Sequence, residues 1–202
     1  MVRLALSASV MIICAWPPER TFAEDKSQGN DRKKTNIVSE LTYNSSDIKT
    51  KQTTSSTASN LQVSTIALEL GGDYFLTPYL ALTGSLQLTL YASTDAEMKG
   101  VEAGLRYYPW QAGSKSETTL GASVLETSPG LSYFIHGGYV GKDYQFSSTS
   151  LFFQGMEAGG GFDYHLSQVT FWRLNVDYQM LQNTSARSQN GFAVGVAYGY
   201  AL

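Results

Sequence analysis

Large apolar residues alternate with small or polar residues along most of this chain from residue 36 onward. The segment 79–92, YLALTGSLQLTLYA, shows the pattern most clearly. From Leu80 to Leu90, leucine occupies every second position apart from Gly84, and alanine, threonine, serine or glutamine stands between. A period of two places successive side chains on opposite faces of a β-strand. Because the apolar spacing of a helix is nowhere sustained, the pattern predicts an all-β protein.

The alternation predicts eight strands, and most reach the roughly 9–11 residues that a tilted strand needs to cross a bilayer. The predicted strands lie at 36–43, 65–76, 79–92, 100–108, 131–141, 151–165, 169–181 and 191–202. The connections at 77–78 and 166–168 are short. Those at 44–60, 93–99, 142–150 and 182–189 are polar and mostly longer. This asymmetry is typical of an eight-stranded antiparallel transmembrane β-barrel, built as an up-and-down meander.

The connection at 109–130 does not fit a short turn, and it contains a strand-like piece at 118–125. A ninth strand would make the strand number odd and would place the two chain ends on opposite sides of the membrane. We therefore predict that 109–130 is an elaborated periplasmic connection outside the barrel.

The distribution of lysine indicates which face of the strands meets lipid. A sheet that faces water carries lysines, which also protect its edges. From Leu61 to Leu202 the only lysines are Lys99, Lys115 and Lys142, and the pattern places all three in loops or at strand ends. The polar face is rich in Gly, Ala, Ser and Thr, which suits a narrow interior, and aromatic residues gather near strand ends as in interfacial girdles. The pattern favours a membrane barrel over a soluble periplasmic lipocalin-like binding barrel, which stays open as an alternative.

The first 23 residues have the layout of a secretory signal peptide. A short basic start up to Arg3 precedes an apolar run from Leu4 to Trp16, and Ala23 is a small residue suited to cleavage. The run is shorter than the roughly 20 apolar residues of a membrane helix. We predict a signal at 1–23, a flexible charged leader at 24–35 and a barrel at 36–202. Since Cys14 is the only cysteine, the mature chain would hold no disulfide.

The signal, the alternating strands and the last strand resemble the small outer-membrane barrels, the group that includes OmpX, Ail and the OmpA transmembrane domain. Gly195, Tyr198 and Tyr200 match the spacing of that family's C-terminal assembly signal, although the chain ends on Leu202 where the family usually has an aromatic residue. The resemblance implies a place in the Gram-negative outer membrane, among its lipid and lipopolysaccharide. It also implies insertion by the barrel assembly machinery.

Charged residues on the inward face form the candidate site. An eight-stranded barrel has room for side chains inside but not for an open channel. We expect Arg106 and Arg173 each to bridge two or more acids and to plug the lumen, in a polar network with a structural role. The acids outnumber the arginines, so the surplus must be hydrated or protonated. The predicted network comprises Glu69, Asp73, Glu102, Arg106, Glu157, Asp163, Arg173 and Asp177.

Catalytic chemistry has weak support in the sequence. His165-Leu166-Ser167 has the H-x-S spacing of outer-membrane lipid A deacylases, so a lipid A-modifying hydrolase is a second alternative. However, the trio falls in a predicted turn, and the nearest downstream acid, Asp177, points inward. Since no His, Cys, Asp or Glu cluster has metal-ligand spacing, we predict no catalytic residue, no cofactor and no metal site.

The remaining expectations concern partners. The net charge of −3 gives no reason to expect nucleic-acid binding, which needs a basic patch. The loop expected at 44–60 is hydrophilic and rich in Ser and Thr. Loops on rigid barrels commonly carry recognition, so a host or surface ligand would bind there, but the sequence does not identify it.

Overall fold

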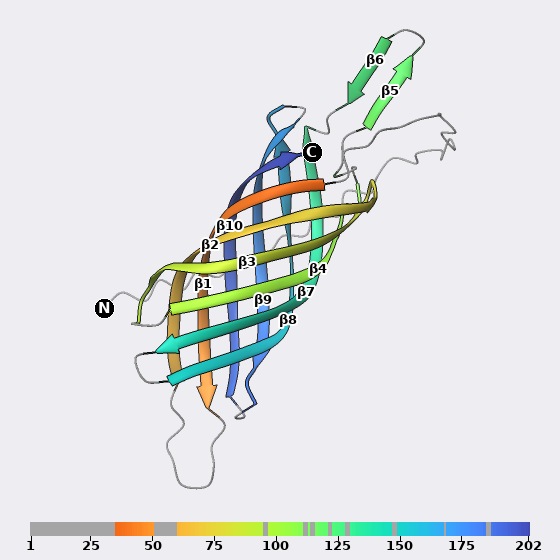
Figure 1. Ribbon diagram of the computed structural model, residues 1–202. Helices are drawn as coiled ribbons and strands as arrows, with labels where there is room; N and C mark the ends of the chain where they lie inside the picture. The colour runs from red at the N-terminus through yellow and green to blue at the C-terminus, as the bar shows by residue number, and fades with distance from the viewer. Residues whose placement is uncertain are drawn as a thin grey trace, which may run out of the picture.

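The computed structural model of this chain contains a closed barrel of eight antiparallel strands (Figure 1). The structure describes residues 35–50, 60–94, 97–110, 113, 116–120, 123–127, 130–146, 149–167, 169–184 and 187–202. The predicted signal peptide and nearly all of the predicted leader lie outside these residues. Within the described part of the chain, no helix is long and apolar enough to cross a membrane.

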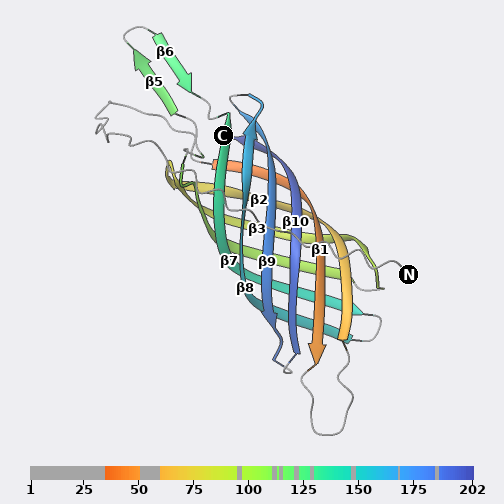
Figure 2. The same ribbon diagram turned by 180° about the vertical axis from the view of Figure 1, so that it is seen from behind.

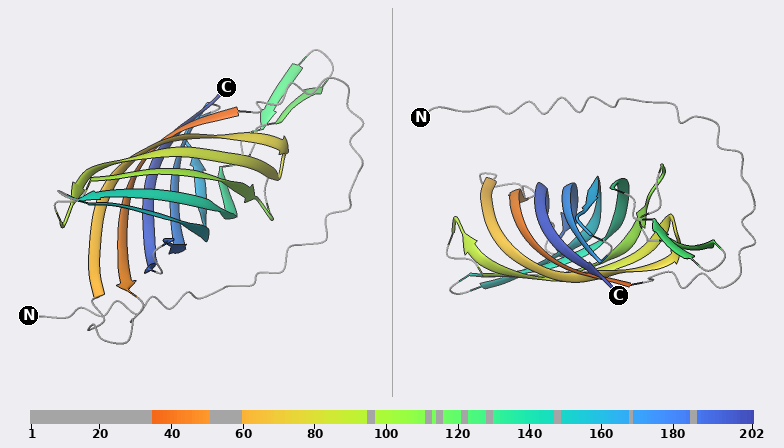
Figure 3. Two further views of the ribbon diagram at one scale, coloured as in Figure 1. Left: turned by 60° about the horizontal axis from the view of Figure 1, so that its bottom comes forward. Right: turned by 90° about the horizontal axis from the view of Figure 1, so that it is seen from above.

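The barrel strands follow one another around the wall in chain order, so the predicted up-and-down meander is confirmed. They run obliquely around the interior (Figure 3). The strands are β1 (Thr35–Thr50), β2 (Asn60–Thr77), β3 (Leu80–Ala92), β4 (Glu97–Tyr107), β7 (Leu131–Phe146), β8 (Thr149–His165), β9 (Thr170–Gln182) and β10 (Arg187–Ala201). β1 pairs with β10 along its length, from Asn36↔Ala201 to Thr50↔Arg187, which closes the barrel.

Two further strands form a separate sheet outside the barrel. β5 (Ser116–Leu120) and β6 (Ser123–Thr127) pair only with each other (Figure 2). The prediction of an extra connection outside the barrel is therefore confirmed, although its strand-like piece is two strands and not one. This connection lies at the end of the barrel where β1 begins and β10 ends, here called the terminal end (Figure 1). The opposite end is called the loop end.

The short turns predicted at the terminal end are confirmed between β2 and β3 and between β8 and β9, but the prediction of mostly long loops at the loop end is wrong. β1, β7 and β10 extend well into the segments expected to be loops, so the loop-end connections shrink to 51–59, 93–96, 147–148 and 183–186. The longest connection, between β4 and β7, is at the terminal end. The predicted loop 44–60 thus begins with seven strand residues, and Lys142 lies inside β7 instead of in a loop or at a strand end.

The outer face of the barrel is apolar, as predicted. Leucine and aromatic side chains project from every strand, and Leu86 and Tyr91, for example, are 61% and 63% exposed. The interior holds glutamate, aspartate, arginine, lysine, asparagine and glutamine side chains. A lipocalin-like soluble barrel requires the reverse arrangement, with an apolar cavity and a polar exterior.

Small residues let the last strand close the barrel. The Gly/Ala row of β10 faces inward, with Ala193 and Ala197 buried. A Cβ at Gly199 would collide with the ring of Phe171, and one at Gly195 with the carboxyl of Glu40. The glycines therefore leave room for large side chains of the neighbouring strands.

Apolar clusters lie at both ends of the interior. The cluster at the loop end contains Ile48, Val63, Ala67, Met98, Val140, Tyr144, Phe153 and Leu181. The cluster at the terminal end contains Phe75, Ala81, Tyr108 and Phe134. The charged side chains occupy the space between them.

Candidate functional site in the barrel interior

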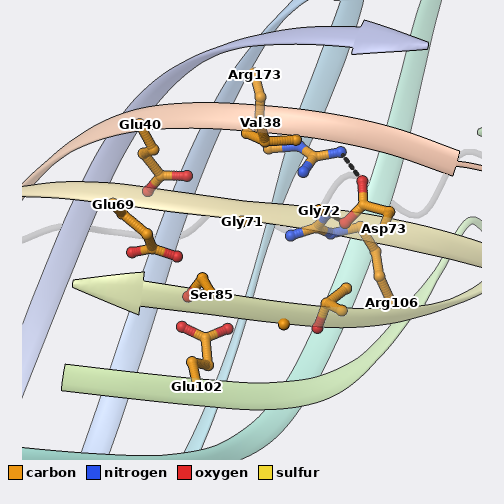
Figure 4. A pocket seen from close by; sticks show the side chains of 12 residues that line it. Val38, Glu40, Glu69, Gly71, Gly72, Asp73, Ser85, Glu102, Arg106 and Arg173 are labelled. Atoms are coloured by element: carbon orange, nitrogen blue, oxygen red, sulfur yellow. Dashed lines mark hydrogen bonds and ion pairs between the residues drawn. The ribbon is translucent and has the colours of Figure 1, made fainter. Parts of the chain in front are cut away.

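A chain of ion pairs crosses the terminal half of the interior. The guanidinium of Arg173 bonds Asp163 through Nε, at 2.7 Å, and Asp73 through Nη2, at 2.8 Å. Arg106 pairs with the other oxygen of Asp73. All four side chains are buried. Figure 4 shows Asp73 between the two arginines. The alternating charges connect β2, β4, β8 and β9 across the lumen, and we call these four residues the arginine–aspartate chain.

Aromatic residues support the arginine–aspartate chain from the terminal end. The hydroxyl of Tyr108 donates a hydrogen bond to Asp163 Oδ2 at 2.8 Å. Its ring meets Phe134 edge-on, with centroids 5.8 Å apart. The guanidinium carbon of Arg106 lies 4.5 Å from the centroid of Phe134, which is within cation–π range. The period of two already placed Tyr108 inward, but its contact with Asp163 depends on the fold.

A second group of side chains, in the middle of the interior, is rich in carboxyls. His136 Nε2 lies 3.1 Å from Asp177 Oδ1 and 3.7 Å from Glu157 Oε1. The other oxygen of Glu157 accepts a hydrogen bond from Gln179 Nε2 at 3.0 Å. Glu102 lies close to both His136 and Glu157. This group draws on β4, β7, β8 and β9.

Lys142 is fully buried beside this group, which the sequence did not predict. Its ammonium donates hydrogen bonds to Gln179 Oε1 at 2.7 Å and to Asn44 Oδ1 at 3.0 Å. Continuing the alternation from His136 through Val140 would have placed Lys142 inward. Its charge and its polar neighbours instead suggested a loop.

A small cavity of about 20 Å³ lies between the two groups. Figure 4 shows the carboxyls of Glu40, Glu69 and Glu102 on one side of it. Glu69 Oε2 accepts a hydrogen bond from Gln87 at 2.9 Å, and Glu40 accepts one from Thr42 at 3.0 Å. The space suffices for about one water molecule, far short of a channel.

The structure places all eight predicted lumen residues on strands. Asp73, Arg106, Asp163 and Arg173 make up the arginine–aspartate chain. Glu102, Glu157 and Asp177 lie in the second, carboxyl-rich group, and Glu69 lines the small cavity between the two groups. Arg173 bridges two acids, as expected. Arg106 contacts one acid, because its other neighbour is the ring of Phe134.

Comparisons with known proteins identify the architecture. No protein-family model matches the chain, and no curated protein matches it significantly. The outer membrane protein OprG from Pseudomonas aeruginosa matches with a TM-score of 0.52 and 16% identity, over 85% of this chain and 97% of that one. The outer membrane protein AlkL, solved in lipid bilayers, matches with a TM-score of 0.52 and 11% identity, over 92% and 96%. The fold is that of the small eight-stranded outer-membrane β-barrels. At these identities the likeness concerns the fold alone, and at that level the predicted resemblance is confirmed.

In this outer-membrane barrel fold, the H-x-S trio lies where β8 turns into β9. The hydroxyl of Ser167 accepts hydrogen bonds from the backbone N–H groups of Val169 and Thr170, at 3.2 and 3.1 Å. His165 packs its ring against Phe171, and Asp177 contacts His136 in the lumen. Ser167 therefore stabilises a turn, and the acid that a hydrolase would need lies beside the other histidine.

Proposed function

We propose that the protein resides in the outer membrane of a Gram-negative bacterium and acts there as a structural or surface-interaction protein, and not as a pore. The apolar exterior supports the membrane location. An apolar surface that continues around the whole barrel far exceeds what soluble proteins expose. Closed barrels are also the one form of β-sheet that lipid tolerates, because every backbone group is paired.

The arginine–aspartate chain carries the second part of the proposal. Arg106, Asp73, Arg173 and Asp163 connect opposite parts of the wall, and the apolar cluster fills the loop end. An ion crossing the lumen would have to separate buried ion pairs, which costs about 3–5 kcal/mol when one partner is lost. The interior therefore favours a plug over a conducting path.

The partners of such a protein follow from its surfaces. Outer-membrane lipid and lipopolysaccharide would surround the apolar belt, and the barrel assembly machinery would recognise the last strand during insertion. A host or surface ligand would meet the loop end. Three of the four connections there have only two to four residues, so the strand ends would share in its recognition.

Conductance measurements test the plugged lumen. The refolded protein inserted into planar bilayers is expected to show no stable open steps, whereas a porin inserted into the same bilayer shows its usual steps. Large, stable conductance from the purified protein would refute the proposal, provided that gel mobility shows the barrel to be folded.

A further inference from the structure

Three side chains of the carboxyl-rich group have the composition and spacing of a metal site. Glu102, His136 and Glu157 each present one potential ligand atom, and these atoms all lie within 4.8 Å of one another. They come from β4, β7 and β8, which are consecutive in the barrel wall. Asp177 of β9, the next strand, reaches the same histidine at 3.1 Å. The spacing along the sequence does not reveal this group, because barrel closure brings it together.

An unsatisfied carboxylate oxygen inside the group points to a cation site. Glu157 is 3% exposed, and its Oε1 makes no hydrogen bond. The distance from this oxygen to His136 Nε2, 3.7 Å, is beyond hydrogen-bond range. Burying a carboxylate oxygen without a donor is costly, and a metal ion would satisfy Glu157 and Glu102 together.

The backbone leaves room for these side chains. Gly159 pairs with His136 on one side and with Asp177 on the other. A Cβ at this position would collide with the Asp177 carboxyl. The glycine therefore allows the acid to approach the histidine.

Neighbouring polar residues hold the group in place. The side-chain amide of Gln179 donates a hydrogen bond to Glu157 Oε2, while its Oε1 accepts a hydrogen bond from the Lys142 ammonium. Such bonds orient the carboxylate, as the groups behind metal ligands commonly do. Two hydrogen bonds also anchor the Lys142 ammonium outside the three-residue group.

We propose that Glu102, His136 and Glu157 bind one divalent cation of the zinc class, with Asp177 as the fourth ligand. One imidazole with carboxylates suits Zn²⁺ or a similar transition ion, whereas Ca²⁺ and Mg²⁺ prefer oxygen alone. Zinc–ligand bonds of about 2.0–2.2 Å require the side chains to move inward by small rotations. Cation binding at this site does not depend on the proposed surface-interaction role of the protein.

The position of the site suggests what the cation does. β4 and β7 are joined by the long connection 108–130 and not by a tight turn, so a large loop has to close before they pair. A cation held by Glu102 of β4 and His136 of β7 would stabilise the pairing of these two strands. Its bond to Glu157 would link the pair to β8.

Zn²⁺ titration of the chelator-treated, refolded protein in detergent tests the site. We expect one Zn²⁺ per chain and a rise in the unfolding temperature, with no such rise from Mg²⁺ or Ca²⁺ at the same concentration. His136→Gln and Glu157→Gln should each weaken Zn²⁺ binding by roughly tenfold or more. Glu40→Gln removes another buried acid of the lumen and should leave Zn²⁺ binding unchanged.

Co²⁺ provides a second measurement on the unaltered protein, which covers variants that fail to fold. Stoichiometric visible absorption bands of a low-coordinate Co²⁺ site, removed by Zn²⁺, are expected. The proposal is wrong if the folded protein neither binds Zn²⁺ stoichiometrically nor gives these bands. It is equally wrong if both ligand variants fold and still bind Zn²⁺ as the unaltered protein does.

Discussion

At the scale of single residues, buried charges set the character of this barrel. Arg173 joins Asp73 and Asp163, while Lys142 is held by two amide oxygens. A buried ion that loses its partner keeps its desolvation cost. The lumen residues are therefore the positions where a single substitution should have the largest effect on stability.

Replacing Arg173 by methionine tests the arginine–aspartate chain. Arg173→Met leaves Asp163 with the hydroxyl of Tyr108, and leaves Asp73 with Arg106 and a long hydrogen bond from Asn36. We expect the free energy of unfolding in lipid vesicles, measured by urea titration, to fall by about 3–5 kcal/mol. Arg187→Met, at the loop end of β10, serves as the control and should change it by less than about 0.5 kcal/mol. Equal stability of the two variants would show that the arginine–aspartate chain contributes nothing to the stability of the barrel.

Lys142→Met tests the residue that the sequence pattern misplaced. Methionine keeps most of the length but leaves Asn44 Oδ1 and Gln179 Oε1 without their donor, in a lumen already rich in acids. The same urea titration should show a loss of about 2–4 kcal/mol. Lys99→Met removes an exposed lysine and should be close to neutral. If Lys142→Met leaves the free energy of unfolding unchanged, the ammonium adds no net stability.

The sequence predicts which way a lumen side chain faces, but not which side chain it contacts. The alternation placed Asp73, Arg106 and Arg173 inward because their strands carry leucine or aromatic residues between. It could not give their pairings, since Asp73 and Arg173 are 100 residues apart. Nor could it give the contact of Glu102 with His136, which depends on how β4 meets β7.

At the scale of elements, the strands are longer than the sequence pattern indicates. β1 has 16 residues, a path of about 53 Å at 3.3 Å per residue, and a strand tilted by about 45° needs only 9–11 residues to cross the bilayer. Near the loop end, outward positions such as Ser45, Asp47 and Lys49 are polar, so both faces look alike. The backbone ladder continues there without the apolar signal, which explains why the sequence pattern predicts a loop at 44–50.

The β5–β6 sheet gives an element-scale prediction. It pairs with no barrel strand, so its removal should leave the barrel wall intact. Replacing 116–127 by a flexible Gly-Ser linker should preserve the folded gel mobility and change the unfolding temperature little. A matched linker in place of 134–140, inside β7, should abolish folding. Failure of the first variant to fold would assign the β5–β6 sheet a part in assembly.

At the scale of the whole molecule, the barrel combines an apolar exterior, which suits lipid, with a charged interior that is closed by ion pairs. Strand count, order and face orientation followed from the sequence because lipid imposes a strict period of two. The loop lengths did not, because polar sequence suits a loop and an extended strand end equally. The apolar exterior and the charged interior together predict that the folded barrel lies in the outer membrane.

Gel mobility of the protein from fractionated cells tests this location and the folded barrel together. Folded outer-membrane barrels resist detergent, so an unheated sample should migrate differently from a boiled one. We expect a heat-dependent shift in mobility for protein recovered from the outer-membrane fraction. Recovery from the soluble fraction, as a single band unchanged by boiling, would contradict it.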